Sequence, residues 1–164
     1  MRTFQDDTPE MRALCARTDV QHMTVFSEPL FTSLEERDKR LVEHMVKEYH
    51  FLAREIYHLI QGKSIEYPRV DAQLIYTHLV TKLSPQDEIS FQSFLSLVGT
   101  GQEANIRRFH LMEFFIRLAA KQKQATREPH LSVAIRKLFD LQVVPYLATW
   151  NNRQKEREFV IWDP

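Results

Sequence analysis

The sequence contains little glycine, and this scarcity excludes the common nucleotide-binding loops. Only Gly62, Gly99 and Gly101 occur in 164 residues. Phosphate-binding loops of the Walker and dinucleotide types need glycines at close, fixed spacing, and neither pattern is present. Each glycine lies between two helical patterns, which is typical of a connector.

Cysteine is scarcer still, with Cys15 as the one thiol. A single cysteine builds no disulfide framework, so we expect an intracellular, reducing setting. No general base can be assigned to Cys15 from the sequence, and we interpret it as an inert thiol. The first residues lack the apolar core of a signal peptide. No apolar run approaches the roughly 18 residues of a membrane span, so we expect no membrane insertion.

The chain also lacks an excess of charge of either sign. Lys and Arg number 22, Asp and Glu number 22, and the net charge is zero. Nucleic-acid-binding domains usually carry a basic excess. We therefore expect no nucleic acid among the partners, and no small-molecule substrate is indicated by any motif.

Helical periodicity is abundant. Residues 33–61 begin with Ser33 and Glu36 at capping-box spacing and continue with apolar residues at three- and four-residue steps. Gly62 supplies the stop. Similar patterns predict helices over 69–83, 85–98 and about 105–122, and a fifth from 131 to about Val144, where Pro145 should end or kink it. The helix at 105–122 is so apolar that we expect it to be central.

These patterns predict an all-α fold with three parts: an extended or partly helical N-terminal arm (1–32), a helical domain (33–148) and a C-terminal tail (149–164). The domain contains helix–connector–helix twice. Ile65 in the first connector and Ile106 in the second stand where a calcium-binding EF-hand pair carries its two paired aliphatic residues.

The calcium ligands themselves are missing. An EF-hand loop needs oxygen ligands at its positions one, three, five and twelve. In this register the four positions hold His58, Ile60, Gly62 and Arg69 in the first loop, and Gly99, Gly101, Glu103 and His110 in the second. One carboxylate in two loops cannot replace the hydration shell of calcium, so no metal is expected.

Residues 40–147 resemble the degenerate EF-hand-like helical modules of protist cytoskeletal and flagellar (axonemal) proteins. In those modules a loop leads into a helix of the form aliphatic–x–Arg–aromatic–x–x–Glu–x–x–x–Arg–x–Ala. The matching residues here, with one-residue liberties, are Ile106, Arg108, Phe109, Glu113, Arg117 and Ala119. The resemblance implies an EF-hand-like pair followed by a further helix, a docking or scaffold role, and no catalytic residues.

A metal-dependent helical-bundle enzyme is an alternative that the ligand count disfavours. Glu55 and His58 form the Glu-x-x-His motif of di-iron bundles, but those sites need two copies, and His110 and Glu113 run in the reverse order. No histidine and cysteine cluster has zinc spacing. We therefore expect no cofactor and no enzymatic activity.

Two surfaces are candidates for partner binding. Arg107 and Arg108 begin a predicted helix, where cations are slightly unfavourable, and such a placement sometimes indicates a carboxylate or phosphate of a partner. Two arginines on an exposed turn with acidic neighbours are the more common arrangement, because surface charge is ordinary. The tail ends in Phe159, Val160, Ile161 and Trp162. Four consecutive apolar residues near a terminus pack either on their own domain or on a partner, where Trp162 would be an anchor.

We therefore expect a non-enzymatic protein that binds other protein subunits of a large intracellular assembly, such as a ciliary or flagellar microtubule structure. The alternative from another setting is a helical accessory subunit of a mitochondrial respiratory or ribosomal complex.

Overall fold

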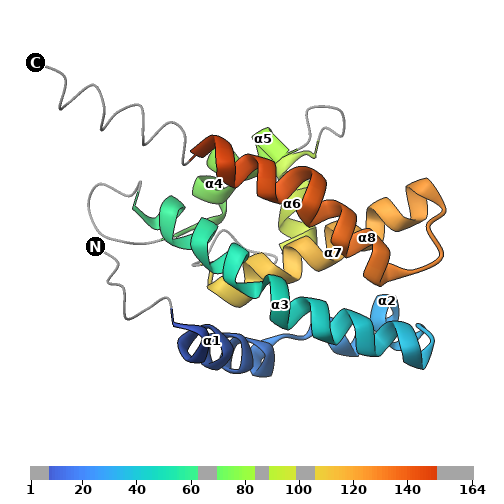
Figure 1. The fold of residues 1–164 in the computed structure, drawn as a ribbon. Coiled ribbons are helices and arrows are strands. Elements are labelled where there is room, and N and C mark those ends of the chain that lie inside the picture. The colour runs from blue at the N-terminus through green and yellow to red at the C-terminus, as the bar shows by residue number, and fades with distance from the viewer. Residues whose placement is uncertain (1–7, 63–69, 84–88, 99–105, 151–164) are drawn as a thin grey trace, which may run out of the picture.

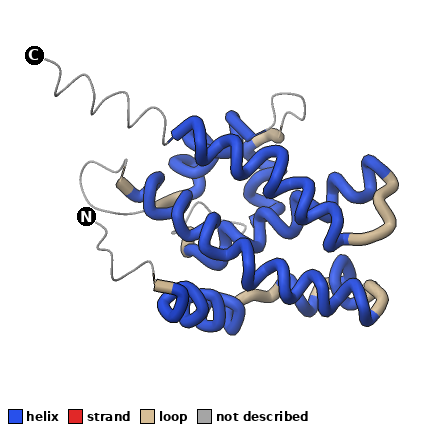
Figure 2. The backbone as a smooth tube through the Cα atoms, in the orientation of Figure 1, coloured by secondary structure: helices blue, strands red, loops and turns tan. Residues whose placement is uncertain are grey.

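Helices dominate the part of the chain that the computed structural model describes, residues 8–62, 70–83, 89–98 and 106–150. These ranges contain no strand (Figure 2), which confirms the all-α prediction. Within them, no helix has the length and the apolar character needed to cross a membrane.

The longest helix is α3, Glu36–Gln61, and it begins differently from the prediction. The expected capping box does not form, because Ser33 ends the short helix α2, Pro29–Thr32. The Ser33 hydroxyl donates to the Pro29 carbonyl of that helix. Glu35 takes the N-cap position of α3 without a side-chain bond. Gly62 follows the last residue of α3, as predicted.

Helix α7, Arg108–Thr126, lies at the centre of the fold and confirms the expectation from its composition. Every residue from Leu111 to Ala119 is buried, because other helices cover it on several sides. It packs against α3, α6 (Phe91–Val98) and α8 (Leu131–Leu138) (Figure 1). Its Phe115 ring meets Phe139 at 5.3 Å between centroids, edge to face, in the middle of the core.

Helix α8 begins under a cap supplied from a distant helix. The carboxylate of Asp38 in α3 accepts the backbone N–H of Leu131 at 2.9 Å and that of Ser132 at 3.3 Å, as well as the Ser132 hydroxyl. These N–H groups have no partner inside α8. A buried carboxylate at a helix N-terminus is also favoured by the helix dipole. Asp38 therefore fixes the start of α8 against α3.

The fifth helix continues through Pro145 instead of ending there. A π-helical segment, η4 (Phe139–Val143), follows α8 directly, and helical backbone then runs from 144 to Trp150. In this segment the Val144 N–H bonds to Phe139, five residues earlier. The wider turn shifts the hydrogen-bond register just where proline cannot donate. Of the two effects expected of Pro145, an end of the helix is therefore wrong, whereas a kink at this residue stays a prediction.

The predicted helix at 69–83 forms over 72–83 as three consecutive segments, α4 (Ala72–Ile75), π-helical η3 (Tyr76–Val80) and α5 (Thr81–Leu83). The Asp71 side chain caps it by accepting the Leu74 N–H at 2.9 Å. The first residues of the helix predicted over 85–98, up to residue 88, lie outside the described residues.

The N-terminal arm, predicted as extended or partly helical, contains helix α1, Pro9–His22, the 3-10 helix η2, Val25–Ser27, and α2. The Thr8 hydroxyl caps α1 by accepting the Met11 N–H at 3.1 Å, and Pro9 fits the first helical position. The sequence of α1 has no apolar stripe, so periodicity could not reveal it. This part of the arm packs against the domain through α1–α3 and α1–α7 contacts.

A backbone hydrogen bond joins the described ends of the two connectors. The Ile106 N–H donates to the Val70 carbonyl at 2.8 Å, and the Tyr57 hydroxyl donates to the Ile106 carbonyl at 2.6 Å. Val70 and Ile106 each precede an N-cap residue, Asp71 and Arg107 respectively. Ile65, the residue expected to pair with Ile106, lies outside the described residues.

Candidate interaction surface

An exposed apolar face runs along the C-terminal helix, residues 139–150. Leu141 is 71% exposed and Val144 is 42% exposed, and Pro145 and Ala148 are exposed as well. Their spacing of three, four and seven residues from Leu141 places them on one helix face. We call these four residues the C-terminal stripe. The described part of this helix ends at Trp150, within the C-terminal tail predicted at 149–164.

The opposite face of this helix is fixed to the domain. Phe139 and Val143 are buried in the core, and the Phe139 ring stacks on Tyr49 of α3 at 4.7 Å. The Tyr146 hydroxyl donates to the His78 carbonyl at 2.7 Å, within the π-helical segment η3. The C-terminal stripe therefore projects from a helix with a defined orientation.

Tyr49 adds a polar tie to the same helix. Its hydroxyl donates to the Asp140 carboxylate at 3.3 Å. Burial raises the pKa of Tyr49, and the Asp140 charge raises it further. The phenol therefore stays protonated and able to donate at neutral pH. Asp140 directly precedes Leu141, so this hydrogen bond from α3 fixes the position of the first residue of the C-terminal stripe.

The two arginines expected to bind a partner differ in their surroundings. Arg107 is exposed at the N-cap of α7. Arg108 turns inward and pairs with Asp19 of α1, at 3.4 Å between Nη2 and Oδ1. A carboxylate does meet Arg108, but it comes from the chain itself. Phe159, Val160, Ile161 and Trp162 lie outside the described residues.

Asp19 joins a small buried cluster between α1, α3 and α7. Its Oδ2 lies 2.7 Å from Nε2 of His50, and both side chains are almost fully buried. Arg108 Nη1 lies 3.7 Å from Cys15 Sγ, and Arg54 Nη1 lies 4.0 Å from the same sulfur. The cluster thus combines one carboxylate with two guanidinium groups and an imidazole.

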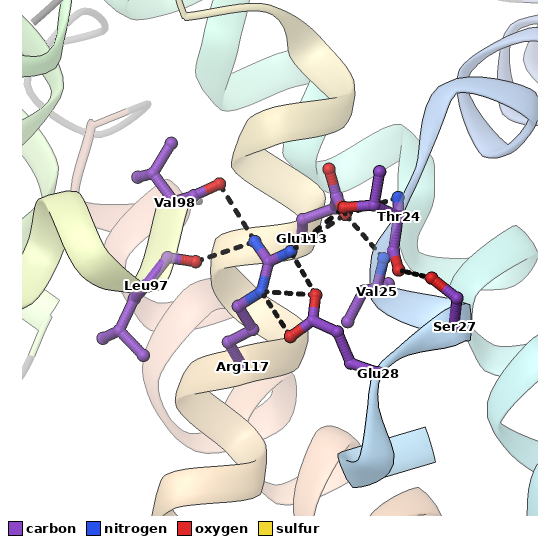
Figure 3. A network of polar contacts seen from close by, with 8 residues as sticks. All are labelled: Thr24, Val25, Ser27, Glu28, Leu97, Val98, Glu113 and Arg117. Atoms are coloured by element: carbon purple, nitrogen blue, oxygen red, sulfur yellow. Dashed lines mark hydrogen bonds and ion pairs between the residues drawn. The ribbon is translucent and has the colours of Figure 1, made fainter. Parts of the chain in front are cut away.

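A second polar cluster ties the chain after α1 to the central helix (Figure 3). Glu113 Oε2 accepts the backbone N–H groups of Thr24 and Val25, each at 2.9 Å. Arg117 donates to the same oxygen at 3.2 Å. Arg117 also bonds Glu28, with Nη2 at 2.6 Å from Oε2. We call these residues the Glu113–Arg117 clamp.

The Glu113–Arg117 clamp also caps α6. Arg117 Nη1 donates to the carbonyls of Leu97 and Val98, each at 2.9 Å. Those carbonyls end α6 and have no partner within that helix, and a cation is favoured there. Because Glu113 and Arg117 direct their bonds to neighbouring segments, the arrangement holds helices together.

His110 is half-buried at the start of α7. Its Nδ1 accepts the Arg107 N–H at 3.0 Å, which requires an unprotonated nitrogen. Burial lowers the pKa of His110, and the charges of Arg107 and Arg117 lower it further. The neutral ring is therefore the form that the fold favours.

The described residues contain no group of three or more His, Cys, Asp or Glu side chains placed to hold a metal ion. The expected calcium positions in the first connector lie partly outside these residues, as do most of those in the second. The absence of a metal stays a prediction from the ligand count.

Sequence reasoning missed the C-terminal stripe and both polar clusters. The signal for the stripe was present: from Leu138 to Val144 five of seven residues are apolar, more than one buried face can hold. The signal for the clamp was Glu113 and Arg117 at four-residue spacing within a helix that is apolar all round. The Asp19–His50 contact carried no local signal, because the two residues lie 31 positions apart.

Comparisons with known protein families, with curated proteins and with solved structures found no match to this chain. The resemblance to protist cytoskeletal modules therefore rests on the sequence pattern alone.

Proposed function

We propose that this chain is a non-enzymatic docking protein that binds other proteins within a large intracellular assembly. The observation that carries the proposal is the C-terminal stripe. Leu141 and Val144 are large apolar side chains, more than two-fifths exposed and one turn apart, on a helix whose other face is anchored. Exposed apolar residues that gather on one face mark sites of protein contact.

The tail extends this docking region. Phe159, Val160, Ile161 and Trp162 follow the stripe helix after a charged stretch. A helix face followed by an apolar segment can engage a partner at two points on one chain. Linking two contacts raises the effective concentration of the second once the first has formed.

Internal pairing of the buried polar groups supports a structural role. Asp38, Glu113 and Asp19 cap helices or pair with Arg and His side chains. A general acid or base must reach a substrate proton, whereas these carboxylates are engaged within the fold. Their geometry suits a rigid scaffold that presents its outer faces.

We also propose that the domain is a degenerate EF-hand-like pair, with α3 and 72–83 as one unit and α6 and α7 as the other. The Ile106–Val70 hydrogen bond supports this arrangement, since EF-hand loops pair through their eighth positions. With Val70 as that position, the ligand positions of the first loop hold Lys63, Ile65, Tyr67 and Leu74. None of them supplies a carboxylate for calcium.

In such a pair the apolar groove between helices receives a target helix. Here α8 lies against α3 and α7, and it buries Leu131, Ile135 and Leu138. In this proposal α8 fills the groove of the pair, and the partner binds an outer surface. The C-terminal stripe provides that outer surface.

The resemblance of residues 40–147 to cytoskeletal modules favours a ciliary or flagellar microtubule structure as the assembly. The alternative assembly is a mitochondrial complex. The same experiment tests both assemblies, because they would differ in their partner proteins while the docking surface of this chain would be the same.

The test is quantitative co-purification of the tagged full-length chain from the cells that express it. The variants Leu141→Glu and Val144→Glu place charges on the stripe, and deletion of 157–164 removes the apolar tail. Leu14→Glu is the matched control, since Leu14 is also exposed, at 47%, but lies on α1. We expect the stripe and tail variants to lose the same partners that the control retains. Full retention by the stripe variants would contradict the proposal.

A further inference from the structure

Helix α1 is held to the domain mainly by polar contacts. Among the residues of α1, only Ala16 and Asp19 are buried. The neighbouring α8, although shorter, buries Leu131, Ile135 and Leu138. Because apolar burial is the main source of stability, α1 contributes little to the core. Elements with few buried apolar contacts open at a low free-energy cost.

The polar contacts gather around Asp19. Its two carboxylate oxygens meet His50 Nε2 at 2.7 Å and Arg108 Nη2 at 3.4 Å. One turn earlier, Cys15 lies against the guanidinium groups of Arg54 and Arg108. The surface of α3 and α7 that faces Asp19 and Cys15 therefore presents one imidazole, from His50, and two guanidinium groups, from Arg54 and Arg108.

Aromatic rings border this surface at both ends of α1. The Arg12 guanidinium lies 4.8 Å from the centre of the Phe51 ring of α3. The His22 ring stacks on Phe109 of α7 at 5.5 Å. These two contacts favour a helix that spans the distance from Phe51 to Phe109 and carries an acidic residue between its two contact points.

The backbone changes from helical to extended at Met23, directly after α1. Met23 has extended backbone, with φ −76° and ψ 135°, and the next two residues are fixed by the Glu113–Arg117 clamp. Movement of α1 about Met23 would break the Asp19 contacts and leave the clamp intact. In Figure 1, α1 lies at the bottom of the view, next to α3.

We propose that the surface between α3 and α7, formed by His50, Phe51, Arg54, Arg108 and Phe109, is a binding groove for an acidic helical segment of a partner protein. Helix α1 occupies this groove in the isolated chain and swings out about Met23 when the partner binds. Charge complementarity selects the partner: it must present a carboxylate where Asp19 now lies. This groove is independent of the C-terminal stripe.

Amide hydrogen exchange of the full-length chain tests the opening of α1. The Asp19→Asn variant removes the central carboxylate, and Glu10→Gln is the control, because Glu10 lies on the same helix but is exposed. We expect Asp19→Asn to speed exchange in residues 9–22 by at least about tenfold, while α3 and α7 stay slow. Unchanged exchange in α1, or equal acceleration throughout the domain, would overturn the proposal.

Binding of a labelled peptide of residues 8–23 tests the groove itself. The recipient is the full-length Ala16→Pro variant, in which proline disrupts α1 and frees the groove. We expect the peptide to bind this variant and not the native chain, and added salt to weaken the binding. A peptide with Asp19→Asn should bind at least about tenfold more weakly.

Three results would overturn the proposal of a binding groove between α3 and α7. Equal binding of the two peptides would show that the carboxylate is not recognised. No binding to the Ala16→Pro variant would show that the groove is not a separate site. Loss of the cooperative melt in Ala16→Pro would show that α1 belongs to the core.

Discussion

The carboxylate of Glu113 accepts the backbone N–H of Thr24 at 2.9 Å across 89 positions of the sequence. The same oxygen accepts from Arg117, four residues along α7. One buried carboxylate therefore links the N-terminal segment to the central helix, and its charge is balanced by a guanidinium that also bonds Glu28.

Removal of Arg117 should be severe because it leaves Glu113 buried without its cation. Glu113 is 2% exposed, and breaking one half of a buried pair costs about 3–5 kcal/mol. We expect Arg117→Met to lower the free energy of unfolding by that amount in urea titration. The double variant Glu113→Gln, Arg117→Met should recover part of the loss. A double variant as unstable as the sum of the two single variants would contradict the coupling.

Truncation of Phe115 should also destabilise the chain strongly. Phe115 is fully buried, and its ring lies tilted against Phe114 and edge to face with Phe139. Phe115→Ala should leave a cavity and cost roughly 3–5 kcal/mol. The midpoint of urea unfolding measures this loss, with Leu14→Ala as a surface control. A loss similar to that of the control would mean that α7 is not central.

The position of α7 at the centre was predictable, because a helix with so many apolar residues can only be covered on several sides. The course of the last helix was not predictable. Proline normally ends a helix, and the π-helical turn before Pro145 that accommodates it has no sequence signature. The N-terminal arm was expected to be extended or partly helical, but the extent of helix α1 was not predictable. Its buried face contains a charged residue, so hydrophobic periodicity gave no signal.

The candidate surface was anticipated only in part. Arg108 was a candidate for binding a carboxylate of a partner protein, because it is a cation at a helix start. In the structure it pairs with a carboxylate of the same chain, that of Asp19. Which carboxylate it meets depends on how α1 folds back, and local spacing carries no information about that. The C-terminal stripe needed the exposure of Leu141 and Val144, which follows from the orientation of the whole helix against α3.

His110 should make stability depend on pH. Burial lowers the pKa of His110 in the fold, so the unfolded chain binds its proton first as the pH falls. The stabilisation is fully present above the unfolded pKa of about 6.5 and is lost as the pH falls below it. We expect the melting temperature to fall between about pH 7.5 and pH 5.5, and His110→Gln to reduce that fall.

The exposed His44, which lies 3.5 Å from Glu48 in α3, provides the matched control for this experiment. His44→Gln should keep most of the pH dependence of the native chain. Identical pH profiles for the native chain and His110→Gln would show that His110 does not carry the effect.

Calcium should leave the chain unchanged. Neither the Ile65 register nor the Val70 register of the first connector supplies the oxygen ligands that an EF-hand loop requires, and the Ile106 register of the second does not either. An ion that does not bind the folded state cannot stabilise it. The melting temperature in calcium and in chelator should therefore agree within experimental error. A reproducible rise at micromolar calcium would contradict the interpretation of the connectors as metal-free.

The most direct test of the docking role is the native size of the chain in an extract of its own cells. Gradient sedimentation separates the free chain, of 19.5 kDa, from a large assembly. We predict that the full-length chain sediments with a large assembly and that the double variant Leu141→Glu, Val144→Glu moves towards the free fraction. A native chain that sediments alone, at the size of the free protein, would contradict the account.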